Sequence, residues 1–217
     1  MQALIGCLMG AGLGLAVWLA VRAWPIPSQA SPTGRQPVLL AGLLGRRGVV
    51  VLPLCLALWG AYAGWQAAQP GRTALAVAFA GVLLLISLVD LRAQRIPCFL
   101  LLLLLGLALA QALWLGKPAP WSSLLGLTAG GALLFLLSLP RRGALGADDI
   151  RLAAALGAML GLPDILPALG VGILAGGAGA LWLLATHRAG RRDRMAYAPY
   201  LALGAWLAWT HSFGLWP

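Results

Sequence analysis

The run TALAVAFAGVLLLISLVD occupies residues 73–90 and ends in an aspartate. Its other residues carry no charge, so the run is long and apolar enough to cross a bilayer as a helix. Similar runs recur along the whole chain, which is 61% hydrophobic and only 9% charged. The sequence therefore predicts an all-α, polytopic membrane protein with a bundle of about eight transmembrane helices.

The expected spans form one integral membrane domain over residues 1–217. We expect them at about 3–21, 48–68, 73–90, 97–115, 122–139, 149–162, 165–186 and 196–213. The sixth is short and could be a half-length or tilted helix in protected surroundings. The first lacks a basic segment before it, and we expect it to be retained rather than removed as a signal peptide.

The basic residues predict the orientation. Fifteen Lys and Arg face five Asp and no Glu, which gives a formal net charge of +10. Thirteen of them fall on one side of the expected spans: Arg22, Arg35, Arg46, Arg47, Arg92, Arg95, Arg141, Arg142, Arg151, Arg188, Arg191, Arg192 and Arg194. By the positive-inside rule this side, which includes the proline-rich loop 22–47, is cytoplasmic and both termini are outside. Cations in such loops meet anionic membrane lipids, so we expect no nucleic-acid partner.

Two aspartates are expected at the same membrane face. Asp90 ends the third span going inward, and Asp149 starts the sixth going outward. An ionisable group beside an apolar span is costly and suggests function. Two carboxylates that share a site hold one proton between them and titrate as a unit. One can then activate a water while the other protonates the carbonyl oxygen of a scissile bond, without metal or cofactor.

Structural roles are the alternatives. Asp90 alone could be an interfacial anchor paired with a nearby Arg, and Asp148 or Asp149 alone could be a helix N-cap. Asp148 and Asp149 point about 100° apart on a helix, so we expect only one of them in a dyad. Asp164 is expected in a turn on the far side. Three scattered cysteines without a CxxC pair predict neither a disulfide nor a metal site.

At these positions the chain resembles the type IV prepilin peptidases. DLRAQRIP at 90–97 resembles their first aspartate motif, in which an aliphatic residue and Pro follow the Asp after six and seven residues. GADDIRL at 146–152 is similar to their GxGD motif, and APYLALG at 198–204 is similar to their last helix. The resemblance covers roughly residues 73–210. It implies a membrane-embedded aspartic endopeptidase with Asp90 and Asp149 as its catalytic residues.

The resemblance also implies a substrate and a place. The family removes the short basic leader of prepilins and pseudopilins at the cytoplasmic face of the inner membrane, just before the substrate's hydrophobic helix. This chain departs from the pattern in three ways. Asp148 replaces the Gly before the second Asp, Cys98 replaces a frequent acid or amide, and the loop 22–47 has no cysteine. The last departure implies a short, peptidase-only form without zinc and without N-methylation of the pilin.

Two rival functions stay open. Presenilin-type intramembrane aspartyl proteases also use a GxGD motif, and Pro167-Ala168-Leu169 spells a PAL triplet, although on the far side of the membrane from Asp149. A non-catalytic transport or assembly subunit would instead use the aspartates to pair with Arg.

Overall fold

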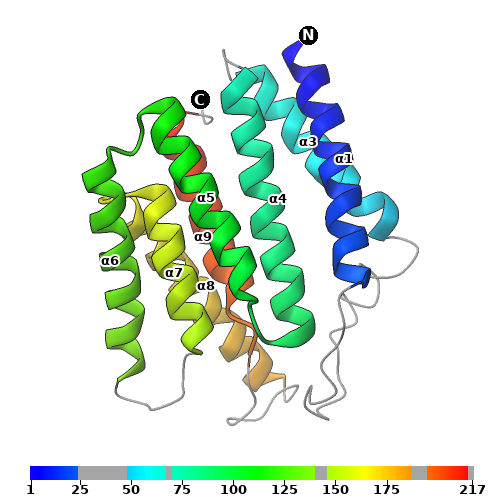
Figure 1. The fold of residues 1–217 in the computed structure, drawn as a ribbon. Helices are drawn as coiled ribbons and strands as arrows, with labels where there is room; N and C mark the ends of the chain where they lie inside the picture. Colours follow the sequence, from blue (N-terminus) through cyan, green and yellow to red (C-terminus); the bar gives the residue numbers. More distant parts are fainter. Residues whose placement is uncertain (24–47, 67–69, 140–145, 187–194, 215–217) are drawn as a thin grey trace. The chain divides into compact units, whose positions relative to one another are not determined.

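The structure, a computed structural model, describes residues 1–23, 48–66, 70–139, 146–186 and 195–214. Within these ranges all regular secondary structure is helical (Figure 1). The helices are α1 Gln2–Ala23, α3 Gly48–Gln66, α4 Pro70–Ala93, α5 Cys98–Leu115, α6 Pro120–Ser138, α7 Ala147–Leu160, α8 Ile165–Ala185 and α9 Ala198–Ser212. The prediction of an all-α protein with about eight helices is confirmed. Most of the loop expected at 22–47, and the arginines at 141, 142, 188, 191, 192 and 194, lie outside the described residues.

The helices differ in whether they are long enough to cross a membrane. Within the described residues, five helices, α1, α4, α5, α6 and α8, are long and apolar enough to cross a membrane. In contrast, α7 has 14 residues, and at about 1.5 Å per residue it rises about 21 Å, less than the roughly 30 Å of a hydrocarbon core. Such a helix needs long neighbours around it. The chain divides into two compact units, Met1–Ala93 and Gln94–Pro217.

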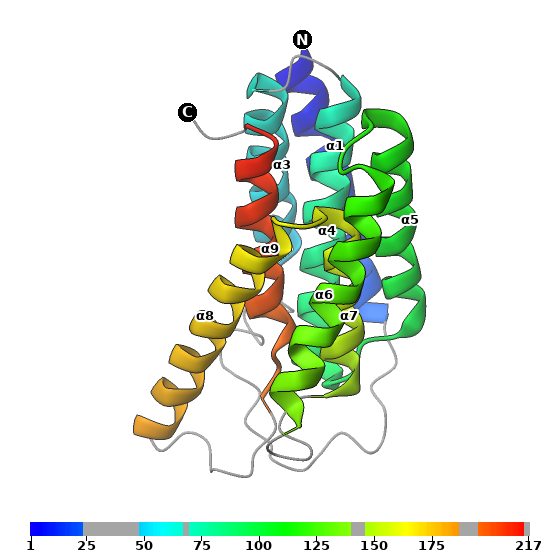
Figure 2. The same ribbon diagram turned by 90° about the vertical axis from the view of Figure 1, so that its left-hand side faces the viewer.

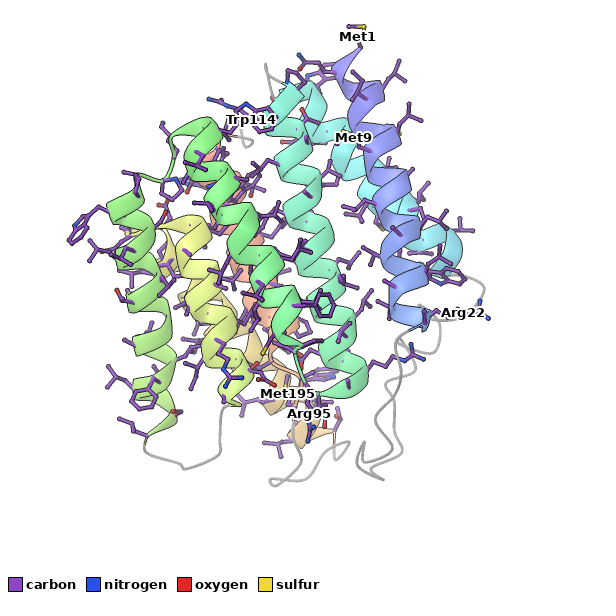
Figure 3. The ribbon with its side chains drawn as sticks, in the orientation of Figure 1. Met1, Met9, Arg22, Arg95, Trp114 and Met195 are labelled. Carbon is purple, nitrogen blue, oxygen red and sulfur yellow. The ribbon has the colours of Figure 1, made fainter. Side chains whose placement is uncertain are left out.

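In the first unit, α1 packs very closely on α3. A Cβ atom added to Gly6 would overlap the carbonyl oxygen of Gly60, and one added to Gly10 would overlap that of Leu56. Backbones in such contact require glycine, which is how small residues bring membrane helices together. In Figure 3, Met1 and Arg22 mark the two ends of α1, with Met9 between them.

Gly10→Val is expected to destabilise the first unit, because the new side chain would collide with the α3 backbone. Overpacking of this kind typically costs about 1–3 kcal/mol. Gly12→Val is the matched control, since nothing lies within 4 Å of a Cβ at Gly12 on the same helix. The thermal midpoint of the purified protein should fall for Gly10→Val alone. Equal midpoints for the two variants would contradict the packing.

In the second unit, α7 is the central helix and contacts α5, α6, α8 and α9. Its contact with α6 is the closest kind: Cβ atoms on Gly126 and Gly157 would each overlap the other's carbonyl oxygen. Figure 1 shows α6 running beside α7, and Figure 2 shows α8 against α9 with the orange end of α8 turned away. The short helix that carries Asp149 is therefore held by four neighbours.

Two sets of hydrogen bonds join the helices of this unit near the turn between α7 and α8. Ser122 at the start of α6 donates from its hydroxyl to the carbonyl of Leu162 over 2.7 Å, and the Leu162 amide donates back to the Ser122 carbonyl over 3.1 Å. The hydroxyl of Ser212 donates to Asp164 Oδ2 over 2.6 Å. Asp164 thus lies just before α8 and ties it to the end of α9.

A buried glutamine joins three helices of the second unit. Gln111 of α5 is fully buried. Its Nε2 donates to the carbonyl of Met159 in α7 over 3.0 Å, and its Oε1 accepts from Trp209 Nε1 of α9 over 2.8 Å. Both ends of the amide are used, so this polar group is compatible with an apolar interior.

Gln111→Leu is expected to destabilise the protein by about 1–3 kcal/mol, because it removes a hydrogen-bond partner from two buried groups at once. Trp209→Phe removes one of the two bonds, so the double variant should be less destabilised than the sum of the single variants. Unfolding of the three variants, followed in the same detergent, measures this. A Gln111→Leu protein as stable as the wild type would show that the bridge contributes nothing.

Candidate active site

Asp90 lies near the end of α4, three residues before the helix ends at Ala93. Its side chain is buried, with 5% of its surface exposed. The helix stops because Gln94 adopts a left-handed conformation, with φ +50°, which is a common way to end a helix. Nearby, Arg92 donates from its guanidinium to the Val21 carbonyl in the last turn of α1. The first unit thus contains the buried carboxylate of Asp90 and the guanidinium of Arg92, which is hydrogen-bonded to the end of α1.

Asp149 lies in the first turn of α7. Its Oδ2 accepts a hydrogen bond from the Gly146 amide over 3.2 Å, and its own amide donates to the Gly146 carbonyl over 3.1 Å. This reciprocal pair caps the helix, and a carboxylate there also suits the helix dipole. Gly146 is thus the N-cap, and Asp149 bonds back to it from the third helical position, so neither aspartate is the N-cap considered for the sequence. One N–H bond uses a small part of the acceptor capacity of a carboxylate, so capping leaves room for chemistry.

Asp148 makes different contacts. Its Oδ2 accepts from the backbone amide of Ile96 over 3.4 Å, and its Oδ1 pairs with Arg151 over 3.3 Å. Both partners belong to the second unit. The two neighbouring aspartates therefore serve different groups, as expected for side chains that diverge on a helix.

Tyr197 is a site residue that the sequence did not reveal. It directly precedes α9, and burial, followed by the negative charge of Asp149, raises the pKa of its phenol. Its ring packs over Gly176 of α8, where an added Cβ would lie 2.9 Å from Tyr197 Cζ. Tyr197 stands immediately before the segment APYLALG, and that adjacency was the available signal. A phenol beside a carboxylate can donate a hydrogen bond or orient a peptide carbonyl.

A basic and an aromatic side chain mark the two ends of α5. Arg95 lies in the linker before α5, whereas Trp114 lies at the other end of α5 (Figure 3). Trp114 and Trp121 are 72% and 69% exposed, as is typical of aromatic side chains at a membrane interface. Within the described ranges, no group of three His, Cys, Asp or Glu side chains could hold a metal ion. The candidate site residues are thus the carboxylate of Asp90 in the first unit, and the carboxylates of Asp148 and Asp149 with the phenol of Tyr197 in the second.

Comparison with known proteins points to one family. The model of the type IV leader peptidase family matches residues 77–182, a range that includes Asp90 and Asp149. The chain is 28% identical over 136 residues to the prepilin leader peptidase/N-methyltransferase of Bacillus subtilis, covering 63% of this chain and 55% of that protein. It is 32% identical over 161 residues to the protein of the same name in Xanthomonas campestris pv. campestris, covering 71% and 54%. The chain thus spans about half the length of these curated relatives. No solved structure gives a significant match.

Proposed function

Because the chain belongs to the type IV leader peptidase family across residues 77–182, we propose that it is a membrane-embedded aspartic endopeptidase that removes the leader of prepilins or pseudopilins. The observation that carries the proposal is the place of Asp149. It is a carboxylate in the first turn of a short helix, α7, that four other helices surround. A second carboxylate, Asp90, falls in the same family segment and is buried near the end of its helix.

In the proposed mechanism the two carboxylates hold one proton between them. The ionised carboxylate takes a proton from a water, whose oxygen attacks the carbonyl carbon of the scissile peptide. The protonated carboxyl group gives its proton to the carbonyl oxygen. Collapse of the tetrahedral intermediate breaks the C–N bond, and the amine leaves with the proton that was taken from the water. One hydroxyl proton of the intermediate returns to the carboxylate that had protonated the carbonyl oxygen. The pair returns to its starting state with no metal or cofactor consumed.

The proposed place of this reaction is the cytoplasmic face of the inner membrane, with both termini outside. The positive-inside rule supports this orientation. Arg95 lies in the linker before α5, and Arg151 lies in the first half of α7. The exposed Trp114 lies at the end of α5, and the exposed Trp121 lies at the start of α6. Membrane lipids are the expected surroundings. The substrates are membrane proteins with a basic leader before an apolar helix.

An intramembrane protease of the presenilin type is the second candidate, on account of the triplet Pro167–Leu169. In the structure this triplet is in the first turns of α8, after the whole of α7 has separated it from Asp149. Ala168 and Leu169 are buried, and an added Cβ at Gly204 of α9 would overlap the Ala168 carbonyl. The triplet therefore packs α8 against α9, and this packing accounts for its burial without a role in catalysis.

The test is cleavage by the full chain, purified into lipid nanodiscs, of a type IV prepilin with its leader intact. Mass spectrometry of the products should place the cut at the junction between the leader and the apolar helix. The same pilin without its leader is the matched control and should stay whole. Cuts inside the apolar helix of both substrates would favour the presenilin-type reading, and no cleavage of either would overturn the proposal.

A further inference from the structure

Asp148 does more than accompany Asp149 in this chain. We propose that Asp148 is a positioning residue that ties the linker Gln94–Pro97 to the first turn of α7 and so fixes the turn from which Asp149 acts. The inference rests on the proposed function, since it concerns the placement of a catalytic group. Its own observation is the hydrogen bond from the Ile96 amide to Asp148 Oδ2, at 3.4 Å.

The linker presents this amide in a restricted way. Gln94 turns the chain with φ +50°, and Pro97 both lacks an N–H and biases the residue before it toward an extended conformation. The Ile96 side chain is buried, with 4% exposed, so this residue is anchored in the fold. A backbone amide at such a point needs an acceptor, because an unpaired buried N–H is costly. Asp148 supplies that acceptor from a helix 52 residues further along the chain.

The pair with Arg151 is the lesser of the two contacts. Arg151 lies three positions after Asp148 on α7, and the side chains of Arg151 and Asp148 are 59% and 32% exposed. A solvent-exposed pair of this kind contributes little to stability. Its consequence is orientation, because it holds Oδ1 on the helix side while Oδ2 faces the linker. The tether between linker and helix is therefore the bond to Ile96.

This tether bears on catalysis through the backbone of the next residue. Asp149 shares a peptide bond with Asp148, so a shift of the first turn moves both. A displacement of about 1 Å in a catalytic group can cost on the order of 100-fold in rate. The linker in turn follows α4 directly, with five residues between Asp90 and Ile96. The GxGD pattern that the chain resembles has Gly at the position of Asp148, and Gly has no side chain to accept this bond, so the tether is a feature of this chain.

The test compares Asp148→Ala and Asp148→Asn in the full chain in nanodiscs. Asp148→Ala removes the acceptor, and we expect kcat on a leader-bearing prepilin to fall about 10- to 100-fold with little change in KM. Hydrogen–deuterium exchange of the peptide that contains Ile96 should become faster. Asp148→Asn keeps an acceptor oxygen and should restore most of both quantities. Asp164→Ala, just before α8, is the matched control and should leave both unchanged.

The outcomes separate this inference from the proposed function. Wild-type kcat and unchanged exchange in Asp148→Ala would overturn the positioning role, while an inactive Asp149→Asn protein would keep the peptidase assignment. Absence of prepilin cleavage by the wild-type chain would overturn the peptidase assignment, whereas faster exchange in Asp148→Ala would still establish the tether. If Asp148→Ala fails to accumulate, Asp148→Gly carries the same expectation. An Asp148→Asn protein as slow as Asp148→Ala would also count against the tether.

Discussion

Asp149→Asn is expected to abolish leader cleavage while the protein still accumulates in the membrane. An amide cannot take a proton from water, and loss of a general acid or base typically costs about 100- to 10,000-fold in rate. The substitution is nearly isosteric. The amide oxygen of Asn can still accept the hydrogen bond that Asp149 Oδ2 accepts from Gly146, so the cap of α7 is kept. Asp149→Asn therefore removes the acid–base function of the side chain and keeps its hydrogen bond at the start of α7.

The measurement is the rate of prepilin cleavage per unit of protein in the membrane, together with the thermal midpoint. Asp164→Asn is the matched control, because Asp164 lies just before α8 and contacts Ser212 at the end of α9. It should cleave at the wild-type rate. Wild-type cleavage by Asp149→Asn would remove Asp149 from the mechanism. A loss of activity matched by a fall in the midpoint would mean that Asp149 is essential as a cap and would leave its chemistry unsupported.

The helices were predictable because their physics is local. A run such as 73–90 is apolar over a length that fits a bilayer, and neither partner nor register is needed to recognise it. The shortness of α7 was visible for the same reason, since the run after Asp149 ends at a Gly-Leu-Pro turn near residue 162. Local sequence also showed that Asp148 and Asp149 start this helix and must diverge.

The contacts of the site were not predictable, because they depend on how helices rotate and slide against each other. Gln111 meets Trp209 across 98 residues, and Asp148 meets Ile96 across 52. The register of neighbouring helices depends on close backbone contacts such as that of Gly126 in α6 with Gly157 in α7. The sequence, with 29 glycines, offers many such pairs and does not say which are used. The place of Tyr197 near Asp149 follows from the same packing.

Capping and catalysis are compatible roles for the Asp149 carboxylate. A capping carboxylate is held by the helix N-terminus in a fixed orientation, and fixed orientation is what a catalytic group needs. The cap is thus a means of placing the side chain. The positioning role that we propose for Asp148 follows the same reasoning.

Asp90→Asn is expected to lose cleavage as fully as Asp149→Asn, by about 100-fold or more. Asp90 is buried near the end of α4. An ionisable group in or beside a bilayer costs free energy, so a carboxylate at this position indicates a function. Ser87→Ala is the matched control on the same helix, because the Ser87 hydroxyl bonds to the carbonyl of Leu83 in its own helix over 2.7 Å. That variant should cleave normally. If Asp90 is an anchor, Asp90→Asn should instead lower the thermal midpoint and spare the rate.

The double variant Asp90→Asn/Asp149→Asn tests whether the two carboxylates form one unit. Groups that act on the same proton are strongly non-additive, so removing both should cost about as much as removing either. Two independent roles would multiply, and the double variant would be slower than each single variant by the product of their effects. A substrate sensitive enough to measure the residual rate of the single variants is therefore required. Equal residual rates in the three variants would support a shared dyad, because the second substitution then has no catalytic pair left to disrupt.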